Sequence, residues 1–514
     1  MSEFEGLRER LSRSLKEARE AFIDLLWGYT RPRGHPAPRA FLFTINGLTY
    51  PIHRDCCVAG VPYPSEISRR KNREKGGQLT FNQQRSKRCY SMLAYLLSVR
   101  RGDLVFFFQA DPQYPMNLDN RRGFRGIWLV ASEPFMDTTI LKSPSTRYEV
   151  LGACPNCGAP FDFGAGEEAF TKGGERKCLW CGKPLGTISL DGRTRYSRII
   201  VSLRLGIAPL LVFRRTSGDN RVYSDMGTPP FIWVSRADNA MGPGKGSSIR
   251  ILLPEEMAKI GYMLATEDAQ SLEEVKCLGY QGRPGRIVDY NGQPIEHLRS
   301  NDGKTLQHEL MLNLYFAVNI DKPNGPLSKL LGINVNEIEY WSSEFPWGYT
   351  GDTADFVLTL WDDNDGRHAI YLFEFKRDDV GVDALAEILL YVPWVSQVLL
   401  QYRAETKKTT VYPVLVGRKA RLRKVPDKYA VSINTVTGKK VIEVERVRVL
   451  EYALRGVYEV CDKVTGKDIY YAKDIQLAPV DLASKPIKPI PPTYTTTEVE
   501  RRHVIKSYLA QLKP

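Results

Sequence analysis

Histidine and long apolar runs are scarce in this sequence. It has six histidines among 514 residues, and none stands in a Ser-His-Asp arrangement, so triad hydrolase chemistry has little support. No apolar stretch approaches the ~20 residues that span a bilayer, and the best candidate, 388–400, contains Pro393, Ser396 and Gln397. The first residues lack the signal-peptide pattern of charge followed by an apolar core. We therefore expect a cytoplasmic protein without a membrane span.

Two familiar motifs are incomplete, and the chain has no internal repeats. The glycine-rich stretch 241–248 lacks the Ser or Thr that a phosphate-binding loop needs directly after Gly-Lys, because Gly246 stands there. The pair His308-Glu309 begins a zinc-protease pattern, but Leu312 occupies the place of the second histidine. We therefore expect neither a phosphate loop of that type nor a zinc-protease helix.

Positive charge is in excess and locally concentrated. The chain has 72 Lys and Arg against 59 Asp and Glu, a net charge of +13 that favours an acidic partner such as DNA. Two basic runs are candidates for phosphate contacts, although a solvated loop explains the first equally well. Their candidate residues are Arg69, Arg70, Lys71 and Arg73 in the first run, and Arg418, Lys419 and Arg421 in the second.

Cysteine is present in an odd number, nine, and four of the nine form a metal motif. Cys154 and Cys157 make one Cys-x-x-Cys pair, and Cys178 and Cys181 make a second pair after twenty intervening residues. Four thiolates close a tetrahedral site and leave no position for water, so the sequence predicts a structural zinc ribbon over 150–185. A metal-binding use of cysteine also fits a reducing compartment.

The most informative segment predicts a β-hairpin with converging charges. Residues 355–361 and 368–376 alternate like strands around the turn residues 362–366, which places Asp355 opposite Glu374. Side chains alternate across a strand, so Glu374 and Lys376 share a face while Phe373 and Phe375 point into a core. A solvated cross-strand ion pair is the plain explanation. Two carboxylates and a lysine also suit a Mg2+ site that activates water beside a phosphate.

The segments 351–355, 374–376 and 383–395 together resemble the PD-(D/E)XK nuclease superfamily, within it the NucS-like or RecB-like branch. The resemblance implies that Asp355 and Glu374 bind Mg2+ or Mn2+, and that Lys376 orients the attacking water. It also implies that Glu309, on a helix leading into the sheet, completes or supports the metal shell. One departure is Glu387, which stands where that branch usually carries Gln.

The first half of the chain is predicted to be rich in strands. Residues 101–108 and 124–135 are similar to the paired central strands of EVE, YTH and PUA-like barrels, which hold a flipped modified base in an aromatic pocket. An ordinary barrel with Trp128 in its core explains the same residues. The candidate pocket residues are Trp128, Phe124 and Tyr114, with Asn46 and Thr44 as polar partners.

The resulting expectation is a multidomain protein of α+β and α/β class. A helix and linker (1–39) precede a PUA-like barrel with an inserted zinc ribbon (40–275), then a linker (276–300). A PD-(D/E)XK mixed sheet flanked by helices (301–455) and an extension (456–514) follow. The predicted activity is a modification-dependent DNA endonuclease of the restriction type. A structure-specific repair nuclease and a non-catalytic nucleic-acid-binding protein remain alternatives, and a double-strand cut would favour a homodimer.

Overall fold

The computed structural model describes most of the chain between residues 39 and 512. The described ranges are 39–47, 49–63, 67–70, 78–81, 83–109, 123–161, 178, 180–185, 187–190, 193–196, 198–218, 249–253, 256–257, 260–261, 264, 272–278, 280, 282–346, 353–362, 366–400, 408–435, 438–489 and 498–512. The expected helix and linker at the amino terminus lie outside these residues except for Arg39. Tyr114, Lys71 and Arg73 lie outside them as well.

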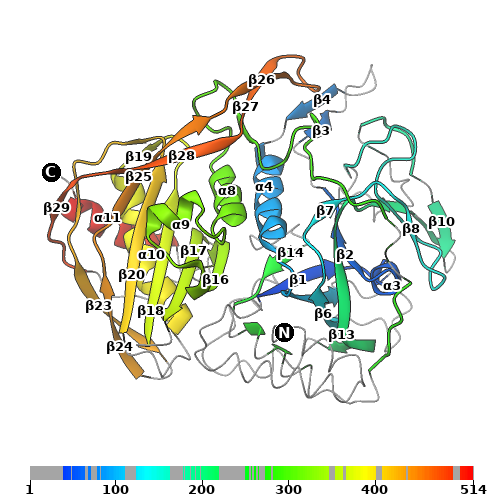
Figure 1. The fold of residues 1–514 in the computed structure, drawn as a ribbon, viewed down its shortest axis with the longest axis horizontal. Coiled ribbons are helices and arrows are strands. Elements are labelled where there is room, and N and C mark those ends of the chain that lie inside the picture. Colours follow the sequence, from blue (N-terminus) through cyan, green and yellow to red (C-terminus); the bar gives the residue numbers. More distant parts are fainter. Residues whose placement is uncertain are drawn as a thin grey trace.

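The protein is a mixed α+β structure with several sheets (Figure 1). The first half is built on a curved half-barrel sheet in the order β14-β1-β5-β6-β13-β2, with β7 also paired to β13. Its strands are β1 (Ala40–Ile45), β2 (Val58–Val61), β5 (Leu104–Gln109), β6 (Gly123–Val130), β7 (Phe135–Met136), β13 (Leu203–Gly218) and β14 (Ile249–Ile251). Among the described residues β14 and β2 do not pair, so the closed barrel expected from the sequence is not seen in this part of the chain.

Two helices and several short strands surround this sheet. Helix α3 (Tyr50–Asp55) leads into β2, and helix α4 (Gln83–Ser98) contributes Leu93 and Leu96 to the core that contains Phe107. The opposite face of the sheet has a separate core around Phe106. The short strands are β3 (Ile67–Arg70), β4 (Gln78–Phe81), β8 (Leu141–Lys142), β9 (Glu149–Leu151), β10 (Thr187–Leu190), β11 (Arg193–Tyr196) and β12 (Arg198–Ile200).

The second half is built on an eight-stranded mixed sheet. Strands β16 (Ile338–Pro346), β17 (Thr353–Asp362) and β18 (Arg367–Phe375) are antiparallel, and β20 (Lys408–Gly417) pairs in parallel with β18. The remaining strands are β23 (Tyr429–Thr435), β24 (Gly438–Val444), β25 (Arg448–Arg455) and β28 (Asp474–Val480). Shorter elements are α9 (Pro326–Leu331), η4 (Val335–Glu337), β19 (Asp379–Val380), β21 (Lys419–Ala420), β22 (Lys424–Pro426) and β29 (Ala483–Lys485).

Helices cover both faces of this sheet. Phe316 of α8 (Leu310–Asn319) packs against Phe373 and Phe375, as the predicted alternation of the hairpin requires. Helix α10 (Val382–Leu400) packs on the other face and against α11 (Glu498–Leu512). Of the helices described, α10 alone is long and apolar enough to cross a membrane by length and composition, and 78% of its most apolar window is buried within the protein.

Two of the expected boundaries do not match the strand pairing. The supposed linker 276–300 contains β15 (Leu298–Ser300), which pairs with β27 (Asp468–Ala472), and β27 in turn pairs with β26 (Tyr458–Cys461). The supposed extension after residue 455 supplies β28, which pairs with β25 in the main sheet. Backbone pairing across long sequence separations therefore makes both segments part of the fold.

The two halves share one hydrophobic core. Helices α4 and α8 lie side by side at the centre of the molecule (Figure 1), and their apolar faces contact each other directly. Leu93 of the first half and Leu314 of the second belong to the same buried cluster. The Arg39 guanidinium lies 3.3 Å from the ring centre of Trp341 on β16, and Arg100 forms an ion pair of 2.7 Å with Asp321. The halves are therefore joined by packing as well as by the chain.

Candidate cation and zinc sites

The β17–β18 hairpin brings Asp355, Glu374 and Lys376 together. The ladder pairs Phe356 with Phe373, so Asp355 and Glu374 stand opposite each other one position further along. The Phe375 amide donates a hydrogen bond of 2.6 Å to Asp355 Oδ2. Lys376 Nζ donates to Glu374 Oε1 at 2.7 Å. The register expected from the sequence is therefore the register of the structure.

Burial makes these carboxylates costly to ionise. Loss of solvent raises the pKa of Asp355 to about 7, although the Lys376 charge and the Phe375 amide act in the opposite direction. Burial also raises the pKa of Glu374 well above its ordinary value, and the neighbouring charge of Asp355 raises it further. Two like charges at a buried position are stable only with compensation.

One oxygen of this cluster lacks a partner. Glu374 is 4% exposed, and its Oε2 atom has no hydrogen-bond partner. A buried oxygen without a partner costs roughly 1–3 kcal/mol, and carboxylate oxygens are the ligands that Mg2+ prefers. The residues present therefore fit a divalent cation beside Asp355 and Glu374.

Glu309, the helix glutamate expected from the sequence, lies directly before the first residue of α8. It is partly buried, and its charge contributes to the raised pKa of Asp355, so the two carboxylates are within electrostatic reach. The neighbouring His308 ring is 6.2 Å from the ring of Tyr90 on α4. Glu309 therefore approaches the β17–β18 hairpin from the start of α8, the helix that packs against α4 of the first half.

Two further glutamates belong to this cluster, and the sequence did not assign a role to either. Glu387 on α10 accepts a hydrogen bond of 2.9 Å from Lys376 Nζ, so the lysine bridges two carboxylates. Although burial lowers the pKa of Lys376, the charges of Glu374 and Glu387 raise it above its ordinary value, which keeps the ammonium charged. Glu387 is the single charged residue between Ala384 and Val395, and this isolated charge in an apolar helix could have indicated a role for it. No comparable sequence pattern marks Glu344 on β16.

The second basic run lies close to this cluster. The Lys376 amide donates to Val416 O, and the Arg418 amide donates to Asp378 O, so the run begins where β18 and β20 end. The side chains of Arg418, Lys419 and Arg421 are exposed. Arg418 and Arg421 both pair with Asp379. Of the first run, Arg69 and Arg70 lie on β3, and nothing is described of their side chains.

The four predicted zinc cysteines form one compact cluster. Their sulfur atoms all lie within 4.8 Å of one another, with distances of 3.8 Å between Cys154 and Cys181 and 3.9 Å between Cys157 and Cys178. A tetrahedral zinc with Zn–S distances of about 2.3 Å implies sulfur separations of about 3.8 Å. The cluster can therefore bind a metal such as zinc.

The two Cys-x-x-Cys-Gly turns of the cluster have the same backbone geometry. In each Cys-x-x-Cys-Gly turn the glycine amide donates to the first cysteine carbonyl, at 2.8 Å for Gly158 and 2.7 Å for Gly182. Both glycines have left-handed φ angles, 71° and 72°, which a side chain would strain. Within the described part of the chain no other group brings three or more metal-ligating side chains so close together.

The aromatic residues predicted to line a base pocket do not face one another. Trp128 and Phe124 are both 0% exposed, and they belong to cores on opposite faces of the half-barrel sheet. The prediction of a shared pocket for these two rings is therefore wrong.

A β-bulge on β6 places Phe124 and Trp128 on opposite faces of the sheet. Residues four apart on a regular strand share a face. Here the ladder pairs Phe107 with Gly126 and Phe108 with Phe124, so Arg125 is an additional residue on β6. A Cβ at Gly126 would lie 2.6 Å from Leu211 O. Of the polar candidates, Asn46 Oδ1 accepts a hydrogen bond from the Thr49 amide at 2.8 Å, and Thr44 is partly buried.

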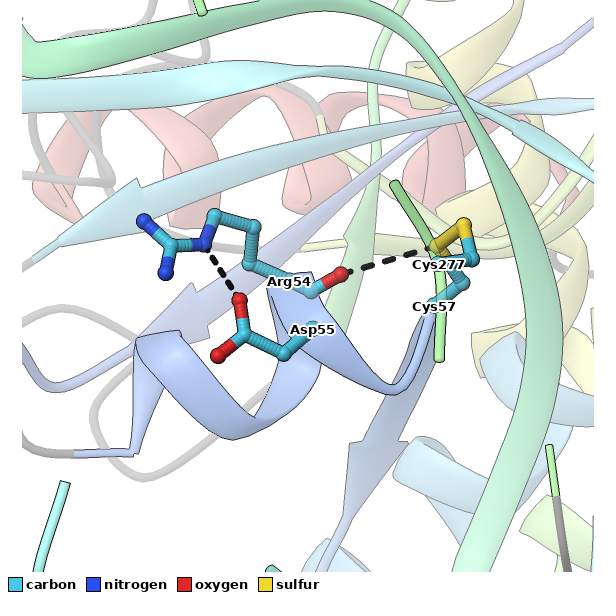
Figure 2. Close-up of a disulfide and its surroundings, with 4 residues drawn as sticks. All are labelled: Arg54, Asp55, Cys57 and Cys277. Carbon is cyan, nitrogen blue, oxygen red and sulfur yellow. Dashed lines mark hydrogen bonds and ion pairs between the residues drawn. A yellow bond between two sulfur atoms is a disulfide. The ribbon is translucent and has the colours of Figure 1, made fainter. Parts of the chain in front are cut away.

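A disulfide joins Cys57 and Cys277, which are separated by 220 residues (Figure 2). Their Cα atoms are 5.6 Å apart, an ordinary distance for such a bond. Cys57 follows α3, where Arg54 Nε donates to Asp55 Oδ1 at 2.7 Å. The sequence, which indicated a reducing compartment, did not predict this bond, because pairing over such a separation depends on the fold.

Comparison with known proteins adds no assignment. No family model and no curated protein matches this chain.

Proposed function

We propose that this protein is a divalent-cation-dependent nuclease that hydrolyses phosphodiester bonds in DNA. The observation that carries the proposal is the buried, unpaired Glu374 Oε2 next to Asp355 and Lys376. Buried charges of one sign normally bind a counter-charge. The mixed sheet flanked by α8 and α10 is consistent with the resemblance to the PD-(D/E)XK superfamily.

The residues of the cluster have separate roles in this proposal. Asp355 and Glu374 would hold Mg2+ or Mn2+, and Glu309 would support them from the start of α8. When bound, the cation would supply an acidified water and neutralise negative charge on the phosphate. Lys376, oriented by Glu374 and Glu387, would direct its ammonium to the attacking water or to the charge that develops on the phosphate.

The basic run at 418–424 supports a polyanionic substrate. Its exposed arginines and lysines follow β20 at the end of the sheet where Lys376 lies. A DNA backbone that contacts this run would therefore pass close to the proposed catalytic cluster. Such contacts bind every sequence alike and weaken with salt.

We assign selection of the substrate to the first half of the chain, and consider two ways in which it could select DNA. A modified-base reader was the first expectation from the sequence, but burial of Trp128 and Phe124 in separate cores removes its two principal aromatic residues. That placement favours the second candidate, a structure-specific repair nuclease whose half-barrel holds DNA without reading a base.

One experiment tests the activity and both modes. Purified protein is incubated with Mg2+ and with methylated, unmethylated, branched and mismatched duplexes. We expect cleavage by the wild type, at least ~100-fold less by Asp355→Asn and Lys376→Ala, and normal cleavage by Glu443→Gln, which alters an exposed ion pair with Lys408. Unchanged cleavage by Asp355→Asn would refute the assignment. Absence of cleavage on all four substrates, with Mg2+ and with Mn2+, would leave a non-catalytic binding protein.

A further inference from the structure

Helix α4 of the first half reaches the candidate cation site through β16. Ser91 and Tyr95, one helical turn apart on α4, both contact Glu344. Ser91 Oγ donates to Glu344 Oε2, and Tyr95 Oη donates to Glu344 O at 3.4 Å. A glutamate of the second half is thus held at its side chain and at its backbone by the first half.

Strand pairing places this glutamate beside Asp355. The β16–β17 ladder pairs Ser343 with Phe356 and Phe345 with Ala354, so Glu344 stands opposite Asp355. Its negative charge is one of those that raise the pKa of Asp355. Asp355 therefore lies between two carboxylates, Glu344 on one neighbouring strand and Glu374 on the other.

The backbone of Glu344 is unusual. Its φ angle is 47°, in the left-handed region that is strained for a residue with a side chain. Such a conformation persists only where surrounding contacts determine it. Ser91 and Tyr95 supply two such contacts, while glycine would fit the backbone better. The fold alone does not call for a carboxylate at this position.

We propose that Glu344 is a positioning residue of the cation site, and that α4 sets its orientation through Ser91. This inference rests on the proposed function. Glu344 adds negative charge beside Asp355, so the site that contains the unpaired Glu374 Oε2 attracts a divalent cation more strongly. Because Ser91 and Tyr95 belong to the first half, the complete site requires the two halves to be packed together.

Helix α4 also contacts a second part of the cluster. Tyr90 of this helix contacts the His308 ring beside Glu309. The same helix therefore reaches the cluster both through Glu344 and next to Glu309.

The test measures cation binding independently of cleavage. Full-length protein is loaded with zinc so that the cysteine cluster is occupied, and free Mn2+ is then followed by its electron paramagnetic resonance signal. We expect Glu344→Gln to weaken Mn2+ binding by at least about 10-fold, the scale of losses at residues next to metal ligands. Ser91→Ala should cause a smaller loss in the same direction. Glu344→Gly should lose Mn2+ affinity while thermal stability stays equal or rises, because glycine accepts the positive φ.

Asp321→Asn is the matched control, since it breaks the Arg100 ion pair between the halves without touching Glu344. It should bind Mn2+ as the wild type does. If Glu344→Gln and Glu344→Gly both retain wild-type affinity while Glu374→Gln loses it, Glu344 has no such role and the proposed function stands. If Asp321→Asn loses as much affinity as Glu344→Gln, general loosening of the interface explains the effect and the proposal is wrong. If wild type and Glu374→Gln bind Mn2+ equally weakly, the proposed function and this inference both fail.

Discussion

Neutralising Glu374 should make the protein more stable while it removes the proposed cation site. Glu374→Gln keeps the shape of the side chain, and its amide oxygen can still accept from Lys376, which also keeps Glu387 as an ion partner. The substitution removes a buried charge and its repulsion with Asp355, while the side-chain amide nitrogen takes the place of the unpaired oxygen. We expect a net gain of about 1–2 kcal/mol in buffer without Mg2+.

Mg2+ should reverse the order of stability. A ligand at 100 times its dissociation constant stabilises the folded state by about 2.7 kcal/mol, and only the wild type has both carboxylates. The assay is thermal unfolding of zinc-loaded protein with and without Mg2+, where each kcal/mol corresponds to about 1 °C, because an unfolding entropy of about 2.1 cal/mol/K per residue extends over 514 residues that share one core. Glu443→Gln, which alters an exposed ion pair, should match the wild type throughout. A Glu374→Gln protein that is less stable than wild type without Mg2+, together with a wild type insensitive to Mg2+, would refute this reasoning.

Three further predictions concern other parts of the fold. Elemental analysis should find about one zinc per chain. Cys178→Ser should abolish zinc binding and lower the melting temperature. Zinc-free protein of normal stability would contradict the predicted zinc site. Burial lowers the pKa of His53 from 6.5 to about 4. Its contribution to stability is therefore complete above pH 6.5 and is lost as pH falls towards 4, about 3 kcal/mol in all. Asp355 titrates in the same range in both proteins, so the loss should appear as the difference between wild type and His53→Gln in denaturation measured between pH 7 and 4.5; equal profiles would contradict it. Thiol titration of unfolded, zinc-stripped protein should give seven free cysteines before reduction and nine after it, whereas nine before reduction would exclude the Cys57–Cys277 bond.

Local pattern predicted the elements that depend on neighbours in sequence. Alternation around the turn residues 362–366 correctly predicted the hairpin register, because side-chain direction in a strand follows from backbone geometry alone. The two Cys-x-x-Cys turns were readable because each knuckle is built by five consecutive residues with a glycine at the left-handed position. The segment 101–108, expected to contain a central strand, overlaps most of β5.

The same rule failed at Phe124 and Trp128. Their spacing of four predicts a common face, but the bulge at Arg125 reverses the alternation. Sequence alone does not show such a bulge, because it depends on how β5 and β6 pair in the folded sheet. The aromatic residues therefore belong to two cores.

The sequence by itself thus determined which residues could carry the chemistry: the hairpin carboxylates and lysine, and the four cysteines that can bind a metal. The tertiary structure decided what surrounds them. Glu387 meets Lys376 because α10 packs across the sheet, and Glu344 meets Ser91 because α4 packs against β16. These contacts join residues 11 and 253 positions apart. Local propensity contains no information about such pairs, since burial of apolar faces between distant elements brings them together.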